Sequence, residues 1–232
     1  MIVLHKKENN TMIAKNLLSH HIIPLRTSDT GAEALGIMND FYIRHLPIVN
    51  DKQLLGLIAE DDILNHDIEE AVGSYQLSMT KPYVRENDHL YDVLKILSEY
   101  QLTVVPVIDA ESNYKGMISQ DDLVKYFANT GSFTEPGSII VLEMEKRDYS
   151  LAEISRIVEG EGGAVLSTFI TSSLDSSKID VTVKINKQDH ILQNIMATFD
   201  RFSYQIKASF QEADYFDGLK ERYDSLMSYL NV

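Results

Sequence analysis

A short apolar run that ends in an acidic pair occurs twice in the first half of the chain. The stretch Gly56–Asp62 has the sequence GLIAEDD, and Gly116–Asp122 has the sequence GMISQDD. An apolar run that contains a proline precedes each copy, at Leu46–Val49 and at Val105–Ile108. The copies are offset by 59 residues at the prolines and by 60 at the glycines. A repeat of this length predicts one supersecondary unit used twice, with the apolar faces of the two units burying each other.

The same hydrophobic pattern predicts the elements of each unit. Apolar runs predict strands at 22–25, 44–49 and 54–59 in the first unit, and at 83–84, 103–108 and 114–119 in the second. The acidic pairs predict short helices at 60–67 and 121–128, because the helix dipole favours carboxylates in the first turn. Each unit also contains a longer amphipathic helix, capped by Ser28 or Asp29 in the first and by Asn87 or Asp88 in the second. The residues predicted to face inward are Ala34, Leu35, Met38 and Phe41 in the first helix, and Leu90, Val93, Leu94 and Leu97 in the second.

The order of elements changes after residue 137. Strands are predicted at 138–145, 164–171, 179–185 and 204–210, and helices at 150–159 and 189–201. The resulting order, strand-helix-strand-strand-helix-strand, is that of a ferredoxin-like unit. The fold class is therefore α/β (α+β): two packed repeats, a βαββαβ domain and a C-terminal helix.

The C-terminal helix is predicted from a stripe of apolar residues spaced three and four apart, namely Phe216, Leu219, Tyr223, Leu226 and Leu230. This stripe packs either on its own domain or on a partner subunit, and we favour the partner because an uncovered stripe would be an exposed apolar patch. The domain boundaries that follow are a flexible extension at 1–11, repeats at 12–68 and 69–130, a linker at 131–137, the βαββαβ domain at 138–211 and the helix at 212–232.

The charge and composition limit the classes of partner. The net charge is −14, which argues against nucleic acid, since that ligand requires clustered Lys and Arg. For the same reason an anionic ligand must be met by backbone N–H groups or by a few cations near the repeated motifs, namely Arg44, His45, Lys115 and Lys125. The 232-residue chain has no cysteine, and no apolar run approaches the length of a membrane span. We therefore expect a cytoplasmic protein without a membrane segment.

The acidic pairs themselves have two interpretations. Asp61, Asp62, Asp121 and Asp122 can be ordinary residues of a first helical turn. Alternatively, a carboxylate at a strand-to-helix turn can accept hydrogen bonds from a ribose diol, while free N–H groups at the helix start favour a phosphate. Asp62 and His66, one turn apart, could also chelate a metal, but a surface pair at this spacing is the usual explanation and no metal site is predicted. Neither repeat pairs a nucleophile with a base, so no catalytic residue is predicted.

Taken together, the motif and the proline run resemble a tandem pair of CBS domains. The nucleotide motif of that family is glycine, any residue, an apolar residue, threonine or serine, two free positions and aspartate. The second copy fits in full through Gly116, Ile118, Ser119 and Asp122, whereas the first has Ala59 at the hydroxyl position. The resemblance implies an adenine nucleotide (AMP, ADP or ATP) or S-adenosylmethionine as a regulatory ligand between the repeats. The binding residues that it implies are Ile23, Arg44, His45 and Asp62 in the first copy, and Tyr83, Val84, Thr103, Val104, Val105, Pro106, Ser119 and Asp122 in the second.

The second half resembles an ACT domain, a sensor module whose family often binds amino acids at paired edges. That family usually carries Asp-x-Pro-Gly after its first strand, where this chain has Arg147-Asp148-Tyr149-Ser150, so the glycine is missing. The full arrangement resembles the regulatory proteins of acetoin-utilisation operons (the AcuB type), through Arg44–Pro47, Pro136–Ser138 and Leu151–Ser155.

These resemblances imply a non-catalytic homodimeric sensor that passes ligand occupancy to a regulated protein partner. A dimeric scaffold with a decayed site is the alternative, and a small metal-dependent hydrolase that uses the Asp pairs is a third hypothesis.

Overall fold

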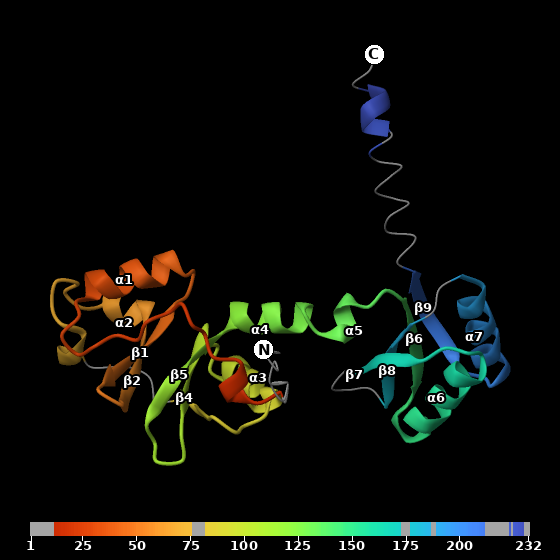
Figure 1. The fold of residues 1–232 in the computed structure, drawn as a ribbon, viewed down its shortest axis with the longest axis horizontal. Helices are drawn as coiled ribbons and strands as arrows, with labels where there is room; N and C mark the ends of the chain where they lie inside the picture. The colour runs from red at the N-terminus through yellow and green to blue at the C-terminus, as the bar shows by residue number, and fades with distance from the viewer. Residues whose placement is uncertain are drawn as a thin grey trace, which may run out of the picture. The chain divides into compact units, whose positions relative to one another are not determined.

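The computed structural model describes residues 12–75, 82–172, 177–186, 189–211, 223 and 225–229. The chain divides into two compact units, Met1–Phe127 and Ala128–Val232, which are described separately below (Figure 1). No helix in the described part of the chain is both long and apolar enough to cross a bilayer.

The first repeat is a helix packed beside a two-stranded hairpin. It contains α1 (Gly31–Asp40), β1 (His45–Asn50), β2 (Gln53–Ala59) and α2 (Glu60–Leu64), and the short helices η1 (Ala14–Asn16) and η2 (Val72–Ser74) lie before and after it in the chain. Strands β1 and β2 are antiparallel, and Leu25 forms an isolated parallel bridge with Ile48 at the free edge of β1. The hairpin register places His45 opposite Ala59, so the start of β1 lies beside the repeated motif.

The second repeat has the same arrangement. Its elements are β3 (Val84–Arg85), α3 (Leu90–Glu99), β4 (Val104–Ile108), β5 (Tyr114–Ser119) and α4 (Gln120–Ala128). The strands form one sheet in the order β3-β4-β5, and Val104 lies opposite Ser119 as His45 does opposite Ala59. Gly116 has a φ of 151°, and a Cβ there would lie 3.1 Å from Leu18 Cδ2, so the motif glycine permits a close contact with the segment before the first repeat.

Each repeat is completed by the segment that precedes the other repeat. The N–H groups of Ala14 and Lys15 donate to the carbonyls of Asp88 and Glu86 in the second repeat, at 2.9 and 3.0 Å. In the same way, the N–H groups of Val72 and Gly73 donate to Asp29 and Thr27 in the first repeat, at 2.8 and 3.0 Å. The two repeats therefore exchange short segments around an approximate two-fold axis.

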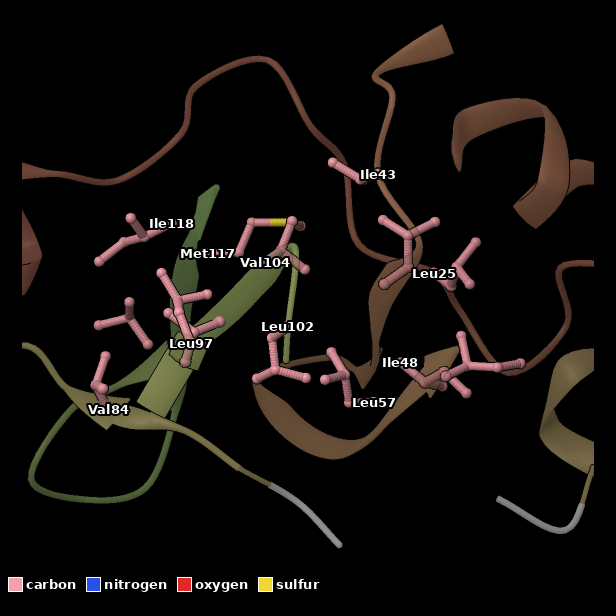
Figure 2. Close-up of a cluster of buried hydrophobic side chains, with 14 of the residues drawn as sticks. Leu25, Ile43, Ile48, Leu57, Val84, Leu97, Leu102, Val104, Met117 and Ile118 are labelled. Carbon is pink, nitrogen blue, oxygen red and sulfur yellow. The ribbon is translucent and has the colours of Figure 1, made fainter. Parts of the chain in front are cut away.

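A large hydrophobic cluster joins the two repeats. Figure 2 shows Leu25, Ile48 and Leu57 of the first repeat and Val104 and Met117 of the second as members of this cluster. All five side chains are almost fully buried. Burial of apolar area is the main stabilising contribution in folding, so the repeats stabilise each other.

The second unit is a four-stranded antiparallel sheet with two helices on one face. Its elements are α5 (Gly131–Thr134), β6 (Ser138–Glu145), η3 (Lys146–Asp148), α6 (Leu151–Gly160), β7 (Val165–Thr171), β8 (Lys178–Ile185), α7 (Asp189–Arg201) and β9 (Gln205–Gln211). The strand order is β7-β8-β6-β9, which is that of a ferredoxin-like unit. Its core lies between the sheet and α6 and α7, where Ile140, Leu142 and Val181 pack against Ile157 and Phe199.

Several local predictions were wrong. The cap of α1 is Thr30, in a capping box with Glu33, because Asp29 instead accepts the Arg26 N–H at 2.8 Å. The cap of α3 is His89, because Asp88 likewise accepts the Arg85 N–H at 2.7 Å. In both repeats the aspartate closes the turn before the helix, and the helix starts later than predicted.

Four further differences concern the burial of one residue and the limits of elements. Phe41 follows the last turn of α1 and is 40% exposed rather than inward-facing. The predicted strand 22–25 is reduced to one bridge at Leu25, and α2 ends at Leu64. The short helix α5 lies within the predicted linker. The predicted extension at 1–11 lies outside the described residues, as do Phe216, Leu219 and Leu230 of the C-terminal stripe.

Candidate functional site

The turn between β5 and α4 holds Ser119 and Asp122 in direct contact. Ser119 Oγ donates to Asp122 Oδ2 at 2.5 Å and accepts the Asp122 backbone N–H at 3.0 Å, and the Ser119 N–H donates to the same carboxylate oxygen at 3.3 Å. This reciprocal pattern is a helix cap. Among the described residues, Oδ1 of Asp122 has no protein donor. A ligand hydroxyl can therefore reach this half-buried carboxylate at Oδ1, or at Oδ2 by displacing Ser119.

The corresponding turn of the first repeat lacks the hydroxyl. Asp62 Oδ2 accepts the Ala59 N–H at 3.0 Å, and Ala59 has no side-chain group to return the bond. Asp62 is only 7% exposed. The first copy therefore keeps the geometry of the turn but offers a less accessible carboxylate.

The starts of β1 and β4 bind each other between the two motif turns. The Arg44 backbone N–H donates to Thr103 Oγ1 at 2.9 Å, and the Thr103 backbone N–H donates to His45 Nδ1 at 3.2 Å. Thr103 Oγ1 also lies 3.1 Å from His45 Nδ1. Because Arg44 and Thr103 are 59 residues apart, they are equivalent positions of the two repeats, and the contact lies at the approximate two-fold axis.

These bonds fix the protonation state of His45. A backbone N–H can only donate, so Nδ1 must accept and the neutral ring carries its proton on Nε2. Burial, followed by the nearby charge of Arg44, lowers the pKa of His45 from its usual value of 6.5, and Asp62 and Asp61 oppose the shift. His45 therefore serves as a neutral acceptor between the repeats.

Gln120 is a contact residue that the sequence prediction missed. Its backbone N–H donates to the Thr103 carbonyl at 3.0 Å, and its side-chain Nε2 donates to the Leu102 carbonyl at 2.9 Å. In the first repeat the Glu60 N–H donates to the Arg44 carbonyl at 2.9 Å. Glu60 and Gln120 are 60 residues apart, the same offset as the motif glycines, so the repeat itself indicates that the two positions are equivalent. Each motif turn is thus tied to the start of the strand beside it.

The remaining residues implied by the resemblance do not all gather at this place. Thr103, Arg44 and His45 meet, and Ser119 and Asp122 meet on the adjacent turn. Val84, Val104, Val105 and Pro106 are buried in the core, so only their backbone could face a ligand. Tyr83 is 41% exposed.

Ile23 belongs to a different place in the first unit. It lines a separate cavity of about 640 Å³ whose walls are 23–28 and 49–51. That cavity includes neither motif turn, and the role of Ile23 beside Ser119 and Asp122 stays a prediction.

Arg44 is the cation best placed to meet an anion. Its side chain is exposed, and it forms no ion pair with any residue that the structure describes. Lys125, by contrast, binds Asp121 at 2.5 Å. The backbone of Arg44 is tied to Thr103 and Glu60, and its exposed guanidinium has no ion-pair partner among the described residues.

The described residues contain no cluster of three or more His, Cys, Asp or Glu side chains that could hold a metal. Nδ1 of His66 bonds to the backbone carbonyl of Asp62 at 2.6 Å, and its ring stacks on Tyr75. His66 lies just beyond the end of α2, where a backbone carbonyl of that helix and an aromatic neighbour hold its ring.

The second unit has a cavity of about 480 Å³ at the loop before α6. Its walls include Asp148, Glu153 and Tyr204. Glu153 pairs with Arg156 at 2.7 Å and Asp148 with Arg147 at 3.8 Å, so most of the negative charge at this cavity is balanced. No described residue here forms a pattern comparable with the motif turns of the first unit.

Comparison with known proteins identifies the first unit. The model of the CBS domain matches residues 14–69 and 72–129. The chain spans only about a quarter of the length of the first curated relatives that it matches. One is inosine-5'-monophosphate dehydrogenase of Methanocaldococcus jannaschii, 27% identical over 48% of this chain and 23% of the dehydrogenase.

Two solved structures are also similar. One is a protein of Thermotoga maritima described as a CBS domain pair/ACT domain protein, with 23% identity and a TM-score of 0.45 over 50% of this chain and 96% of that one. The other is a putative acetoin utilization protein (AcuB) from Vibrio cholerae, with 22% identity and a TM-score of 0.45 over 51% of this chain and 92% of that one.

Proposed function

Residues 14–69 and 72–129 are a pair of CBS domains, and on that premise we propose that the chain is a non-catalytic sensor of an adenine nucleotide or adenosyl compound. The observation that carries the proposal is the second motif turn. There Ser119 and Asp122 stand beside the contact between Arg44 and Thr103 at the two-fold axis. A ribose diol is the ligand group that a carboxylate at a strand-to-helix turn suits, because its hydroxyls can donate charge-assisted hydrogen bonds to the carboxylate.

Of the side chains that the structure describes at this site, Arg44 is the one that favours an anionic ligand, since the motif turns themselves carry carboxylates. Arg44 is exposed and has no ion-pair partner among the described residues, so a phosphate would gain a charge-assisted hydrogen bond there. A sulfonium such as S-adenosylmethionine would be repelled by the same guanidinium. We therefore place AMP, ADP and ATP ahead of S-adenosylmethionine.

Ligand occupancy is proposed to act on the contact between the repeats. The ligand would touch groups of both repeats, and it can shift their relative arrangement only by its differential affinity for the two states. In this proposal the ACT-like second unit of a homodimer relays the change to a regulated protein partner in the cytoplasm.

The test is a thermal-unfolding panel with AMP, ADP, ATP, S-adenosylmethionine and NAD. A ligand at about a hundred times its dissociation constant adds roughly 2.7 kcal/mol to the free energy of unfolding. We expect the stabilisation with one adenine nucleotide to be lost in Asp122→Asn. It should be retained in Asp121→Asn, the matched control one residue away, whose carboxylate is exposed and binds Lys125.

Each outcome of the panel either locates the ligand site in one repeat or shows that the chain has no such site. Stabilisation that survives Asp122→Asn but is lost in Asp62→Asn would move the site to the first copy. No stabilisation by any compound would contradict the sensor and favour the alternative, a dimeric scaffold with a decayed site. Two observations favour that alternative: Ala59 lacks the motif hydroxyl, and Asp122 Oδ2 is already occupied by Ser119. Nucleotide turnover measured in the same samples would instead indicate a hydrolase.

A further inference from the structure

The first repeat contains a cavity at the free edge of β1, which we call the edge cavity. Its volume is about 640 Å³, and its walls are 23–28 and 49–51. Strand β1 ends at Asn50, whereas the motif turn lies beside the other end of the strand, at His45. Five steps along a strand span about 16 Å, so the walls near Asn50 are a different place from the candidate nucleotide site.

The edge cavity has hydrogen-bond donors at one end and apolar groups at the other. The donors are a guanidinium, two hydroxyls and an amide, from Arg26, Thr27, Ser28 and Asn50. These four side chains are exposed, and within the described part of the chain they have neither ion-pair nor hydrogen-bond partners. At the apolar end Ile23 is 72% exposed, next to Pro24. A ligand would therefore find donors without partners and an apolar surface in the same cavity.

The donors suit a phosphate group better than a carboxylate. Arg26 presents a planar fork of N–H groups, and the other three side chains add donors that the three terminal oxygens of a phosphate monoester can accept. Asp51 is the one carboxylate among the lining residues, and the charge of Arg26 balances it. A volume of about 640 Å³ exceeds what a phosphate ion fills and lies in the usual range of small-molecule sites, so the ligand has an organic part.

The equivalent place in the second repeat has a different charge. At the offset of 59 residues the cavity arginine has an equivalent, Arg85. Two uncharged wall residues are replaced by acids, since Glu86 corresponds to Thr27 and Asp109 corresponds to Asn50. Two carboxylates beside one arginine would repel an anion. The two repeats thus share the arginine, and the first repeat surrounds it with groups that an anion tolerates.

We propose that the edge cavity binds a phosphate monoester of a small organic molecule. The guanidinium of Arg26 and the hydroxyls of Thr27 and Ser28 bind the phosphate through charge-assisted hydrogen bonds. The organic part lies along Ile23 and Pro24 and covers their exposed apolar surface. This site is separate from the one proposed for an adenine nucleotide, and neither depends on the other.

The experiment is a titration of the full chain with phenyl phosphate, followed by phosphorus NMR. We expect saturable binding that is tighter than that of inorganic phosphate, because the ring adds apolar contact. Arg26→Met should weaken it by roughly tenfold or more, since it removes the charge-assisted hydrogen bonds. Thr27→Glu, which introduces the residue of the second repeat, should weaken it by a similar factor. Arg85→Met is the matched control, an exposed arginine at the equivalent position, and should leave binding unchanged.

Three results would overturn the proposal. The first is no saturable binding of phenyl phosphate at millimolar concentration. The second is an equal loss in Arg26→Met and Arg85→Met, which would indicate a general effect of charge. The third is a loss in Arg44→Met but not in Arg26→Met, which would place the phosphate at the motif turns. The nucleotide panel with Asp122→Asn uses another ligand and another residue, so failure of either proposal is distinguishable from failure of the other.

Discussion

His45 and Thr103 hydrogen-bond each other across the approximate two-fold axis of the CBS pair. Thr103 donates its backbone N–H to His45 Nδ1, and its hydroxyl accepts the backbone N–H of Arg44. A single residue of the second repeat thus forms hydrogen bonds with two residues of the first. Since His45 must remain neutral to accept, the contact between the repeats is sensitive to protons.

We expect the free energy of unfolding to fall as the pH is lowered from about 6.5. The folded state lowers the pKa of His45, mainly by burial, so below 6.5 the unfolded chain binds the proton more readily. The loss approaches about 1.4 kcal/mol for each further drop of one pH unit, and it ends below the lowered pKa of the folded state. Above pH 7 this histidine does not make the free energy of unfolding depend on pH. Urea unfolding across this pH range measures the effect.

His45→Asn is the control for the pH dependence. The asparagine side-chain oxygen replaces Nδ1 as an acceptor but does not titrate. The other six histidines are unchanged, so the difference between wild type and variant isolates His45. If the free energy of unfolding changed with pH equally in the two proteins, His45 would not be the source of the effect.

The hydroxyl of the motif turn should stabilise the helix that follows it. Ser119→Ala removes the cap of α4 and is expected to lower the free energy of unfolding by about 1 kcal/mol. Ala59→Ser should raise it by a similar amount, because the new hydroxyl can accept the Asp62 N–H and return a bond to its carboxylate. The urea unfolding midpoints of the two variants provide the test. If both midpoints rose, or both fell, relative to the wild-type midpoint, the two motif turns would not be equivalent.

Two glycines of α1 should respond in opposite directions to the same substitution. A Cβ at Gly31 would lie 2.5 Å from the Tyr75 hydroxyl and 2.9 Å from Ile63 Cγ2, so Gly31→Ala is expected to cost about 1–3 kcal/mol. A Cβ at Gly36 would meet nothing within 4 Å, so Gly36→Ala should stabilise the helix by roughly 1 kcal/mol. Thermal unfolding of the two variants shows whether each substitution stabilises or destabilises the protein. A stabilising Gly31→Ala would contradict the close packing beside Tyr75.

Tyr114 has a buried hydroxyl without a hydrogen-bond partner among the described residues. Tyr114→Phe removes this group and should raise the free energy of unfolding by about 1 kcal/mol. Burial also raises the pKa of the Tyr114 phenol, so wild-type stability should be retained up to about pH 10 and then decline. The variant should show a smaller decline when unfolding is followed in alkaline buffer, and a Tyr114→Phe protein less stable than wild type would reveal an unseen partner.

The sequence predicted most of the second unit because its local signals agree with its packing. The limits of β6 and α7 match the predicted 138–145 and 189–201, since strict alternation and a clear helical period coincide with burial there. The helix caps of the first unit were harder to predict. Asp29 and Asp88 are strong capping residues by type, yet each binds the backbone N–H of an arginine three residues earlier.

Only part of the candidate site could be predicted from the sequence. The motif predicts the contact between Ser119 and Asp122, because the spacing of three residues is local. The bond between Thr103 and His45 joins residues 58 apart, and no local pattern encodes it. Ile23 was implied as a binding residue only by the family resemblance; the strand predicted at 22–25 is reduced to a bridge at Leu25, and Ile23 lines another cavity.

The exchange of short segments between the repeats determines how the protein can be divided. Ala14 and Lys15 complete the second repeat, and Val72 and Gly73 complete the first. A fragment cut between the repeats would therefore carry its neighbour's segment and lack its own. Two such fragments should regain structure only when mixed, as complementary halves. A truncation intended to isolate the sensor must begin before Ala14, even though the first motif lies far downstream of it.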